Sequence, residues 1–185
     1  SNVINVAPAV PNEPHGALVL FNPAGEVVWW HDQGGNFGAI TGMNLTEDET
    51  VLYVFRPTDQ RGEGYEIDFD GNVHWQSREG PWLHHDVAPG PDGKRMYMRW
   101  FFEEYDGDLY EGDGIEVVDP ETNELIWTWN IFDHFAPEDF QVPELANEGL
   151  SRIGALDWSH SNAIIWDEAR SLIWMSVRHF DRLIG

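Results

Sequence analysis

The chain has 185 residues, no cysteine and a formal net charge of −23 at pH 7, because 33 Asp and Glu outnumber 10 Lys and Arg. This acidic balance excludes nucleic acids and anionic membrane surfaces as partners, and the lack of cysteine excludes disulfides and thiol chemistry. Ten Trp, ten Phe and five Tyr favour a packed core over disorder, and no apolar run approaches the roughly 20 residues of a membrane-spanning helix.

The first 15 residues are rich in proline and lack a periodic pattern. We expect residues 1–15 to be an extended N-terminal lead-in that lies over other structure. They also lack the basic and apolar regions of a signal peptide. Regular structure is expected from Gly16 onward, so that residues 16–185 form a single β-rich domain.

One kind of hairpin recurs three times along that domain. Each copy has two β-rich runs around a turn, and the second run contains a tryptophan. The copies span residues 17–30, 64–75 and 114–127. Their tryptophans, Trp29, Trp75 and Trp127, are 46 and 52 residues apart.

A second kind of hairpin alternates with the first, over residues 41–55, 84–100 and 159–179. One pair of hairpins supplies four strands, and the repeat length is typical of a blade in a β-propeller. An ordinary β-sandwich is the competing architecture, but it does not explain the repeat. Since propellers have about four to eight blades, we expect this chain to be a partial propeller of roughly three to four blades. A segment near residues 132–156 breaks the pattern and is predicted to be an insertion with a short helix.

The register of the last hairpin decides which polar residues meet at its open end. With a three-residue loop at 168–170, Asp167 pairs with Ser171, and His160 then falls opposite Arg178. A two-residue loop would turn Arg178 to the other face. We predict the first register, because it joins an imidazole and a guanidinium that can bind one tetrahedral oxyanion.

Aligning the second and third of these hairpins by their turns places His84 on His160 and Asp86 on Asn162. Equivalent ends of inner strands converge on the axis of a propeller, so we expect both imidazoles to face one cavity. Asp86 or Asn162 is then expected to fix the tautomer of its neighbouring histidine. The first hairpin has Gly42 in this region, so the blade itself does not require a histidine.

The box Asp157-Trp158-x-His160-x-Asn162 is followed, eighteen residues after its histidine, by Arg178-His179, and His84-His85-Asp86 lies upstream. Together these motifs resemble the bacterial arylsulfate sulfotransferase family. The resemblance implies a six-bladed propeller that moves a sulfuryl group from an aryl sulfate ester to a phenol. It also implies a sulfohistidine intermediate, no nucleotide donor such as PAPS, and export to the periplasm or the extracellular space.

Carried over residue by residue, the resemblance makes His160 and Arg178 catalytic, together with His84 or, as the alternative, His85. Substrate binding falls to Asn162, Trp158 and Trp82. The family's transiently sulfated histidine lies in a later blade, which by spacing falls beyond Gly185, so we expect this chain alone to be inactive.

The expected partners are phenolic and aryl sulfate small molecules, with a homo-oligomer or further chain segments completing the propeller. No cofactor and no catalytic metal are expected. An acidic run is a candidate for structural calcium, although a solvated loop is the favoured interpretation. Its residues are Asp106, Asp108, Glu111 and Asp113. We predict that His179 faces away from Arg178 and is structural.

Two other functions share these sequence features. A non-catalytic propeller that binds a ligand or a protein needs no basic cluster. A related propeller enzyme acting on another ester or anion would keep the cluster and change the pocket.

Overall fold

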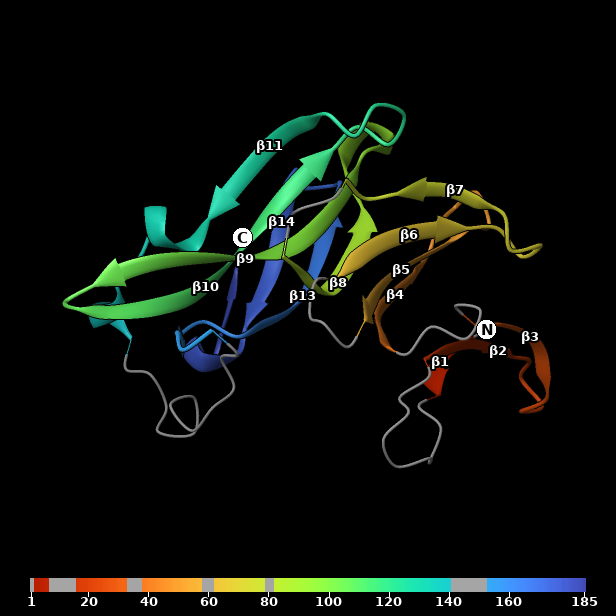
Figure 1. Cartoon of the computed structure of the whole chain (residues 1–185). Helices are drawn as coiled ribbons and strands as arrows, with labels where there is room; N and C mark the ends of the chain where they lie inside the picture. The colour runs from red at the N-terminus through yellow and green to blue at the C-terminus, as the bar shows by residue number, and fades with distance from the viewer. Residues whose placement is uncertain (1, 7–15, 33–37, 58–61, 79–81, 141–152) are drawn as a thin grey trace. The chain divides into compact units, whose positions relative to one another are not determined.

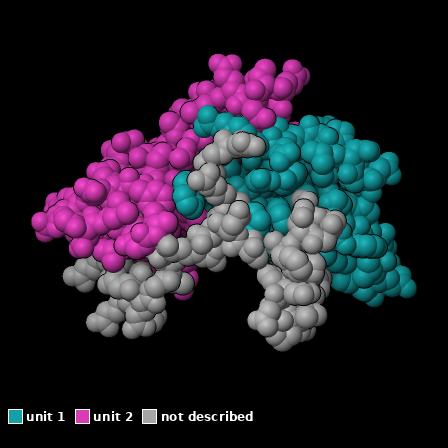
Figure 2. All heavy atoms as spheres, viewed as in Figure 1, with its two compact units in different colours: residues 1–88 teal, residues 89–185 magenta. Residues whose placement is uncertain are grey.

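The structure is a computed structural model that describes residues 2–6, 16–32, 38–57, 62–78, 82–140 and 153–185 (Figure 1). In these ranges the chain forms antiparallel sheets and short 3₁₀ helices, with no α-helix. The all-β prediction is therefore confirmed. The described part holds no helix long and apolar enough to span a membrane. The chain divides into two compact units, Ser1–Ala88 and Pro89–Gly185 (Figure 2).

Unit 1 begins with a three-stranded antiparallel sheet. Its strands are β1 (Asn2–Val6), β2 (Ala17–Phe21) and β3 (Val27–Asp32). Regular structure therefore begins at β1, earlier than the predicted Gly16, because residues of the lead-in pair with β2. The turn between β2 and β3 forms as predicted, since the Asn22 side-chain oxygen accepts hydrogen bonds from two backbone amides of the turn, each at 3.0 Å.

The second sheet of unit 1 is a four-stranded meander. It consists of β4 (Gly38–Leu45), β5 (Val51–Pro57), β6 (Glu63–Ile67) and β7 (Val73–Gln76), paired in chain order. The predicted pair of hairpins therefore forms one continuous sheet. Its buried apolar cluster includes residues of both sheets of the unit: Leu18, Ile40, Val51, Tyr53, Phe55 and Ile67. Burial of each such aliphatic side chain contributes about 1.5–3 kcal/mol.

The unit boundary falls at the last residue of β8 (Leu83–Pro89). Unit 2 then contains η1 (Pro91–Gly93), followed by β9 (Arg95–Tyr105) and β10 (Asp108–Val118). Each of these two strands has 11 residues, and together they form a long hairpin (Figure 1). β11 (Leu125–Asn130) pairs antiparallel with β10, and β12 (Leu156–Asp157) pairs parallel with it.

The β9–β10 hairpin corrects the expected acidic loop. Asp106 and Gly107 form its two-residue turn with φ of 50° and 89°, the left-handed pair of a type I′ turn. Of the four calcium candidates, Asp106 and Asp108 are exposed at the tip, whereas Glu111 and Asp113 are buried along β10. The acidic run is therefore a hairpin, and the side chains of Glu111 and Asp113 are buried in the protein.

The C-terminal sheet has the order β13-β14-β15. Its strands are β13 (Ser161–Asp167), β14 (Leu172–Val177) and β15 (Arg182–Ile184), with η5 (Arg178–Phe180) between the last two. The expected insertion contains η2 (Ile131–Asp133) and η3 (Pro137–Asp139). The rest of the predicted helix there, residues 141–152, lies outside the described residues.

The predicted hairpins are present as several antiparallel sheets. The propeller and its number of blades stay predictions.

Candidate active site

The register of the β13–β14 hairpin differs from the prediction, but the predicted pair of residues still meets. Asp167 pairs with Leu172 rather than Ser171, so the loop has four residues, 168–171. This register alone would place His160 opposite His179. A β-bulge between Ser161 and Ala163 shifts the pairing by one residue. As a result, Arg178 donates its backbone N–H to the His160 carbonyl at 3.3 Å.

His160 lies just before β13 with a left-handed φ of 50°. A residue other than glycine adopts this conformation only when neighbouring contacts hold it. Two such contacts come from beyond β14, since Arg178 N donates to His160 O and His179 N donates to Ser159 O at 3.1 Å. Asn162, which is exposed, also donates from its side chain to His160 O at 3.1 Å.

The strongest anchor of this turn is Asp113 of β10, only 1% exposed. Its Oδ2 accepts from the Ser161 amide at 2.6 Å and from the Ser159 hydroxyl at 2.5 Å, and that hydroxyl accepts from the Asp113 amide at 2.9 Å. These two serines flank His160. A buried carboxylate 46 residues upstream of Ser159 therefore fixes the backbone on both sides of the histidine.

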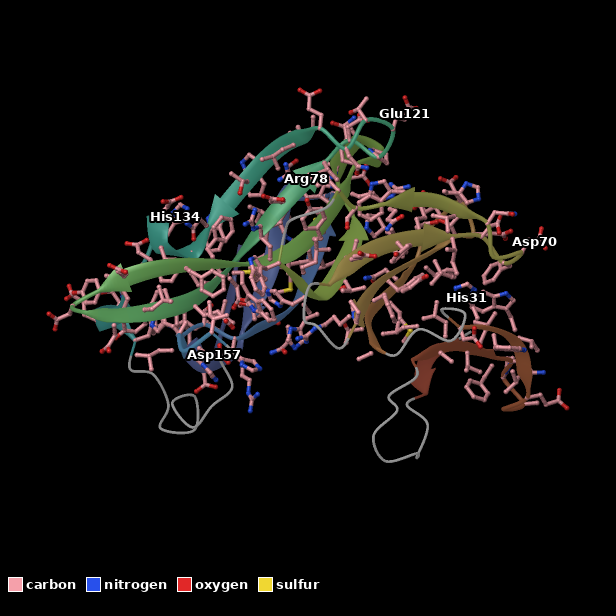
Figure 3. The ribbon with its side chains drawn as sticks, in the orientation of Figure 1. His31, Asp70, Arg78, Glu121, His134 and Asp157 are labelled. Atoms are coloured by element: carbon pink, nitrogen blue, oxygen red, sulfur yellow. The ribbon has the colours of Figure 1, made fainter. Side chains whose placement is uncertain are left out.

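The ring of His160 is held at both nitrogens. Nδ1 contacts Oδ2 of Asp157, which lies in β12 and is labelled in Figure 3. Nε2 lies 3.3 Å from Nη1 of Arg178. A guanidinium only donates, so Nε2 accepts and the ring proton is on Nδ1, facing the carboxylate. The buried carboxylate of Asp157 thus fixes the tautomer that points an Nε2 lone pair towards exposed Arg178.

This arrangement corrects the tautomer prediction. The hydrogen bond from the Asn162 side chain goes to the backbone carbonyl of His160. The imidazole of His160 instead contacts the carboxylate of Asp157. Sequence reasoning quoted Asp157 as part of the box but gave it no role. The i, i+3 spacing of Asp157 and His160 across a tight turn is the local signal that could have found the pair.

Trp158 was predicted to contact substrate, and its burial contradicts that role. Its exposure is 0%, and its indole N–H donates to Phe140 O at 3.2 Å. Its ring stacks on Phe132 and meets Phe180 edge-on, with centroid distances of 5.2 and 4.9 Å. No face of the indole is left for a ligand, so Trp158 anchors the box in an aromatic core.

His179 was expected to face away from the arginine and to be structural. Strand alternation does not extend to this residue, because η5 begins at Arg178. Its ring lies 4.9 Å, centroid to centroid, from that of His160. Its Nδ1 donates to Asp157 O at 3.0 Å, so the second nitrogen carries a lone pair.

The other predicted histidines belong to unit 1. His84 is fully buried in β8, and His85 is half-buried with a left-handed φ of 53°. Their Nδ1 atoms are 2.9 Å apart. By backbone conformation His85, rather than His84, is the counterpart of His160, so the turn-based alignment is off by one residue.

Within unit 1 the starts of two successive hairpins of the second kind touch at this position. Gly42 of β4 also has a left-handed φ, of 56°, and a Cβ there would lie 2.2 Å from the His85 carbonyl oxygen. Asn44 donates to Asp86 Oδ1 at 3.0 Å and to Val87 O at 2.8 Å. Asp86 is therefore engaged by the neighbouring hairpin. Trp82 is half-buried just before β8, and its contact with substrate stays a prediction.

Within the described ranges, the one group of side chains with metal-ligand spacing consists of Asp157, His160 and His179. The four acidic residues predicted for calcium do not form such a group, and the Asp113 carboxylate is occupied by serine donors.

A model of the family described as Arylsulfotransferase (ASST) matches residues 6–185, almost the whole chain. No curated protein matches the chain.

Proposed function

This chain belongs to the arylsulfotransferase family, and on that premise we propose that the end of its β13–β14 hairpin grips the sulfuryl group of an aryl sulfate. Family membership supports aryl sulfotransferase activity at the family level. We propose further that the group passes to a phenolic acceptor through a sulfated histidine, without a nucleotide donor. The donor and acceptor phenols are the small-molecule partners.

The line of contacts from Asp157 through His160 to Arg178 is the observation that supports this proposal most. A sulfate ester is a tetrahedral anion whose oxygens match the donors of a guanidinium. Arg178 is exposed and therefore accessible to such an anion. When the guanidinium turns to the sulfuryl oxygens, Nε2 of His160 is released next to the sulfur, where it can give or take a proton.

The transfer requires two substitutions at sulfur. In the first, the nucleophilic histidine attacks sulfur, the S–O bond to the donor breaks, and its electron pair leaves on the phenolate. In the second, the acceptor phenol oxygen attacks, the S–N bond breaks, and its electron pair returns to the nucleophilic histidine. The acceptor proton moves to Nε2 of His160, where the Asp157 carboxylate stabilises the imidazolium. That proton then neutralises the phenolate that departs in the next cycle.

The remaining predicted residues complete this site in the proposal. We propose His84, or His85 as its alternative, as a further catalytic residue, because a basic group stabilises the negative charge that develops on the sulfuryl oxygens. Trp82 contacts the aromatic ring of the substrate. The fold that gathers these groups is a six-bladed propeller, exported to the periplasm or beyond, with a later histidine as the nucleophile. Support comes from the four-stranded meander of unit 1 and from the left-handed residue that recurs at the start of the second kind of hairpin.

The test is the affinity for an aryl sulfate, measured by calorimetry with 4-nitrophenyl sulfate on the purified chain. Arg178→Gln removes the charged donors and is expected to weaken binding about 10–100-fold, since hydrogen bonds to charged groups contribute about 1.5–3 kcal/mol. Arg170→Gln is the matched control. Arg170 pairs with Asp167 at 2.8 Å at the opposite end of the same hairpin.

Equal losses in the two variants would show that general charge, rather than a site, attracts the anion. In the complete gene product, turnover of the same ester with a phenol acceptor and trapping of sulfate on a histidine test the chemical step.

A further inference from the structure

Three potential metal ligands meet at the anchored turn. One ligand atom each from Asp157, His160 and His179 lies within 4.8 Å of the other two. The carboxylate is buried and the two imidazoles are half-buried. We propose that these three residues bind a divalent transition metal ion of the Zn²⁺ class, and that binding of this ion displaces the Arg178 guanidinium from His160.

The donor set suits that class of ion. Two imidazoles and a carboxylate are a common three-residue set for Zn²⁺, which leaves a fourth position for water. Bonds of about 2.1 Å in a tetrahedron separate ligand atoms by about 3.4 Å. The observed spacing therefore needs only a modest rotation of side chains, two of which are partly exposed. Ca²⁺ and Mg²⁺ prefer oxygen ligands and are excluded by the two imidazoles.

The hydrogen bonds of His179 prepare it for this role. Its Nδ1 donates to the Asp157 backbone carbonyl at 3.0 Å, which leaves the lone pair on Nε2. Metal-bound histidines commonly donate their other ring nitrogen to a carbonyl in this way, because the bond fixes both tautomer and orientation. The strongly acidic chain also raises the local concentration of cations.

Metal binding and the contact between His160 and Arg178 exclude each other. A neutral imidazole has one lone pair. If the metal takes Nε2, that lone pair is used. If the metal takes Nδ1, the proton moves to Nε2, which can no longer accept from the guanidinium. In both cases the Nη1 to Nε2 contact of 3.3 Å breaks, and the cation repels Arg178.

The test is Zn²⁺ titration by calorimetry, with the visible absorption of bound Co²⁺ as a second readout, on the whole chain. His179→Asn retains a donor for the Asp157 carbonyl but loses the metal ligand, so we expect at least a tenfold loss of affinity. His74→Asn is the matched control, because His74 forms an exposed pair with Asp68 at 3.0 Å that belongs to no group of three ligands among the described residues. Its affinity for Zn²⁺ should equal that of the parent.

Arg178→Gln gives an independent measurement that does not remove a ligand. It removes a positive charge and replaces a charged donor with a neutral amide, so Zn²⁺ affinity should rise severalfold, whereas Arg170→Gln should leave it unchanged. Equal Zn²⁺ affinity in His179→Asn and the parent would overturn the proposal, as would weaker binding in Arg178→Gln.

The metal site does not rest on the proposed function, because its test needs no aryl sulfate. If the ester binds to the parent chain and Zn²⁺ affinity ignores His179, the metal site is wrong and the grip at Arg178 stands. If Zn²⁺ affinity falls in His179→Asn and the ester binds equally to Arg178→Gln and Arg170→Gln, the grip is wrong and the metal site stands.

Discussion

His85 in unit 1 and His160 in unit 2 adopt the same left-handed backbone, with φ of 53° and 50°, but their rings have different neighbours. The His85 imidazole lies against another imidazole, that of His84, at 2.9 Å. The His160 imidazole lies between the carboxylate of Asp157 and the guanidinium of Arg178. The same left-handed backbone conformation therefore places two histidine rings among different neighbouring groups.

Gly42 shows what the fold alone requires at this position. It has the same left-handed φ, of 56°, at no steric cost. A histidine there costs about 1 kcal/mol or more in backbone strain. Strain held by surrounding contacts supports a functional role, and at His160 such contacts reach both ring nitrogens and both flanking residues. The proposed function therefore places the proton transfer at His160.

The largest effect should separate the two histidines. In the complete gene product, His160→Asn is expected to lower kcat for aryl sulfate turnover by about 10²–10⁴-fold, the usual contribution of a positioned acid or base. His85→Asn should cost less, since its ring contacts the imidazole of His84 at 2.9 Å, whereas the ring of His160 contacts a carboxylate. A steady-state assay with a phenol acceptor measures both. A larger loss in His85→Asn would transfer the proton role to unit 1.

A smaller effect should follow from the carboxylate alone. Asp157→Asn can still accept from Nδ1 but cannot stabilise an imidazolium, so we expect kcat to fall about 10–100-fold, as for other orienting partners, with little change in KM. Asp86→Asn is the counterpart in unit 1, where the carboxylate accepts from Asn44. If both variants lose the same activity, Asp157 has no special link to the reaction.

The anchor of the turn should affect stability more than binding. Asp113→Ala removes the oxygen that accepts from both the Ser161 amide and the Ser159 hydroxyl in a buried site, which costs about 1–3 kcal/mol of unfolding free energy. Denaturant unfolding measures this loss. Asn44→Ala removes the corresponding hydrogen bonds in unit 1, which are only half-buried. It should lower the unfolding free energy by less. The reverse order would mean that the unit 1 end is the more rigidly held of the two.

The smallest effect should come from Asp119, a half-buried carboxylate directly after β10. Lys94, followed by the backbone amides of Thr122 and Glu121, lowers the pKa of Asp119 to about 2. Because the folded-state pKa is below the ordinary 3.8, the stabilisation is present above pH 3.8 and is lost as the pH falls towards 2.

Asp119→Asn should therefore be slightly less stable than the parent at pH 6, and the difference should shrink between about pH 4 and pH 2. Thermal unfolding across that range checks it. A constant difference would mean that the substitution disturbs the turn for a reason unrelated to charge.

Local signals were sufficient for most of the strands. Turn residues such as Asn22 and Gly71 act within a few positions, so each predicted hairpin of the first kind appears in the structure. The same kind of signal, Asp106-Gly107, was present in the acidic run. The sequence interpretation favours a solvated loop there, because a run of carboxylates is typical of exposed loops. The structure shows a hairpin turn instead.

The meeting of His160 and Arg178 was predicted correctly by way of a wrong loop. The four-residue loop and the bulge at residues 161–163 each shift the register by one, and the two shifts cancel. A period-two pattern cannot reveal such a pair of compensating changes, because both leave the apolar alternation of the strand nearly intact.

The sequence by itself determined the all-β fold, the turns of the repeated hairpins and the meeting of His160 with Arg178, since all of these depend on neighbours along the chain. Only the tertiary structure decided that Asp113 anchors the turn, that Trp158 is core and that Asp157 orients the imidazole of His160. Asp113 is 46 residues from Ser159, and the ring partners of Trp158 come from η2 and η5. Contacts between segments that are distant in sequence depend on how strands and turns pack, and no local pattern encodes that packing.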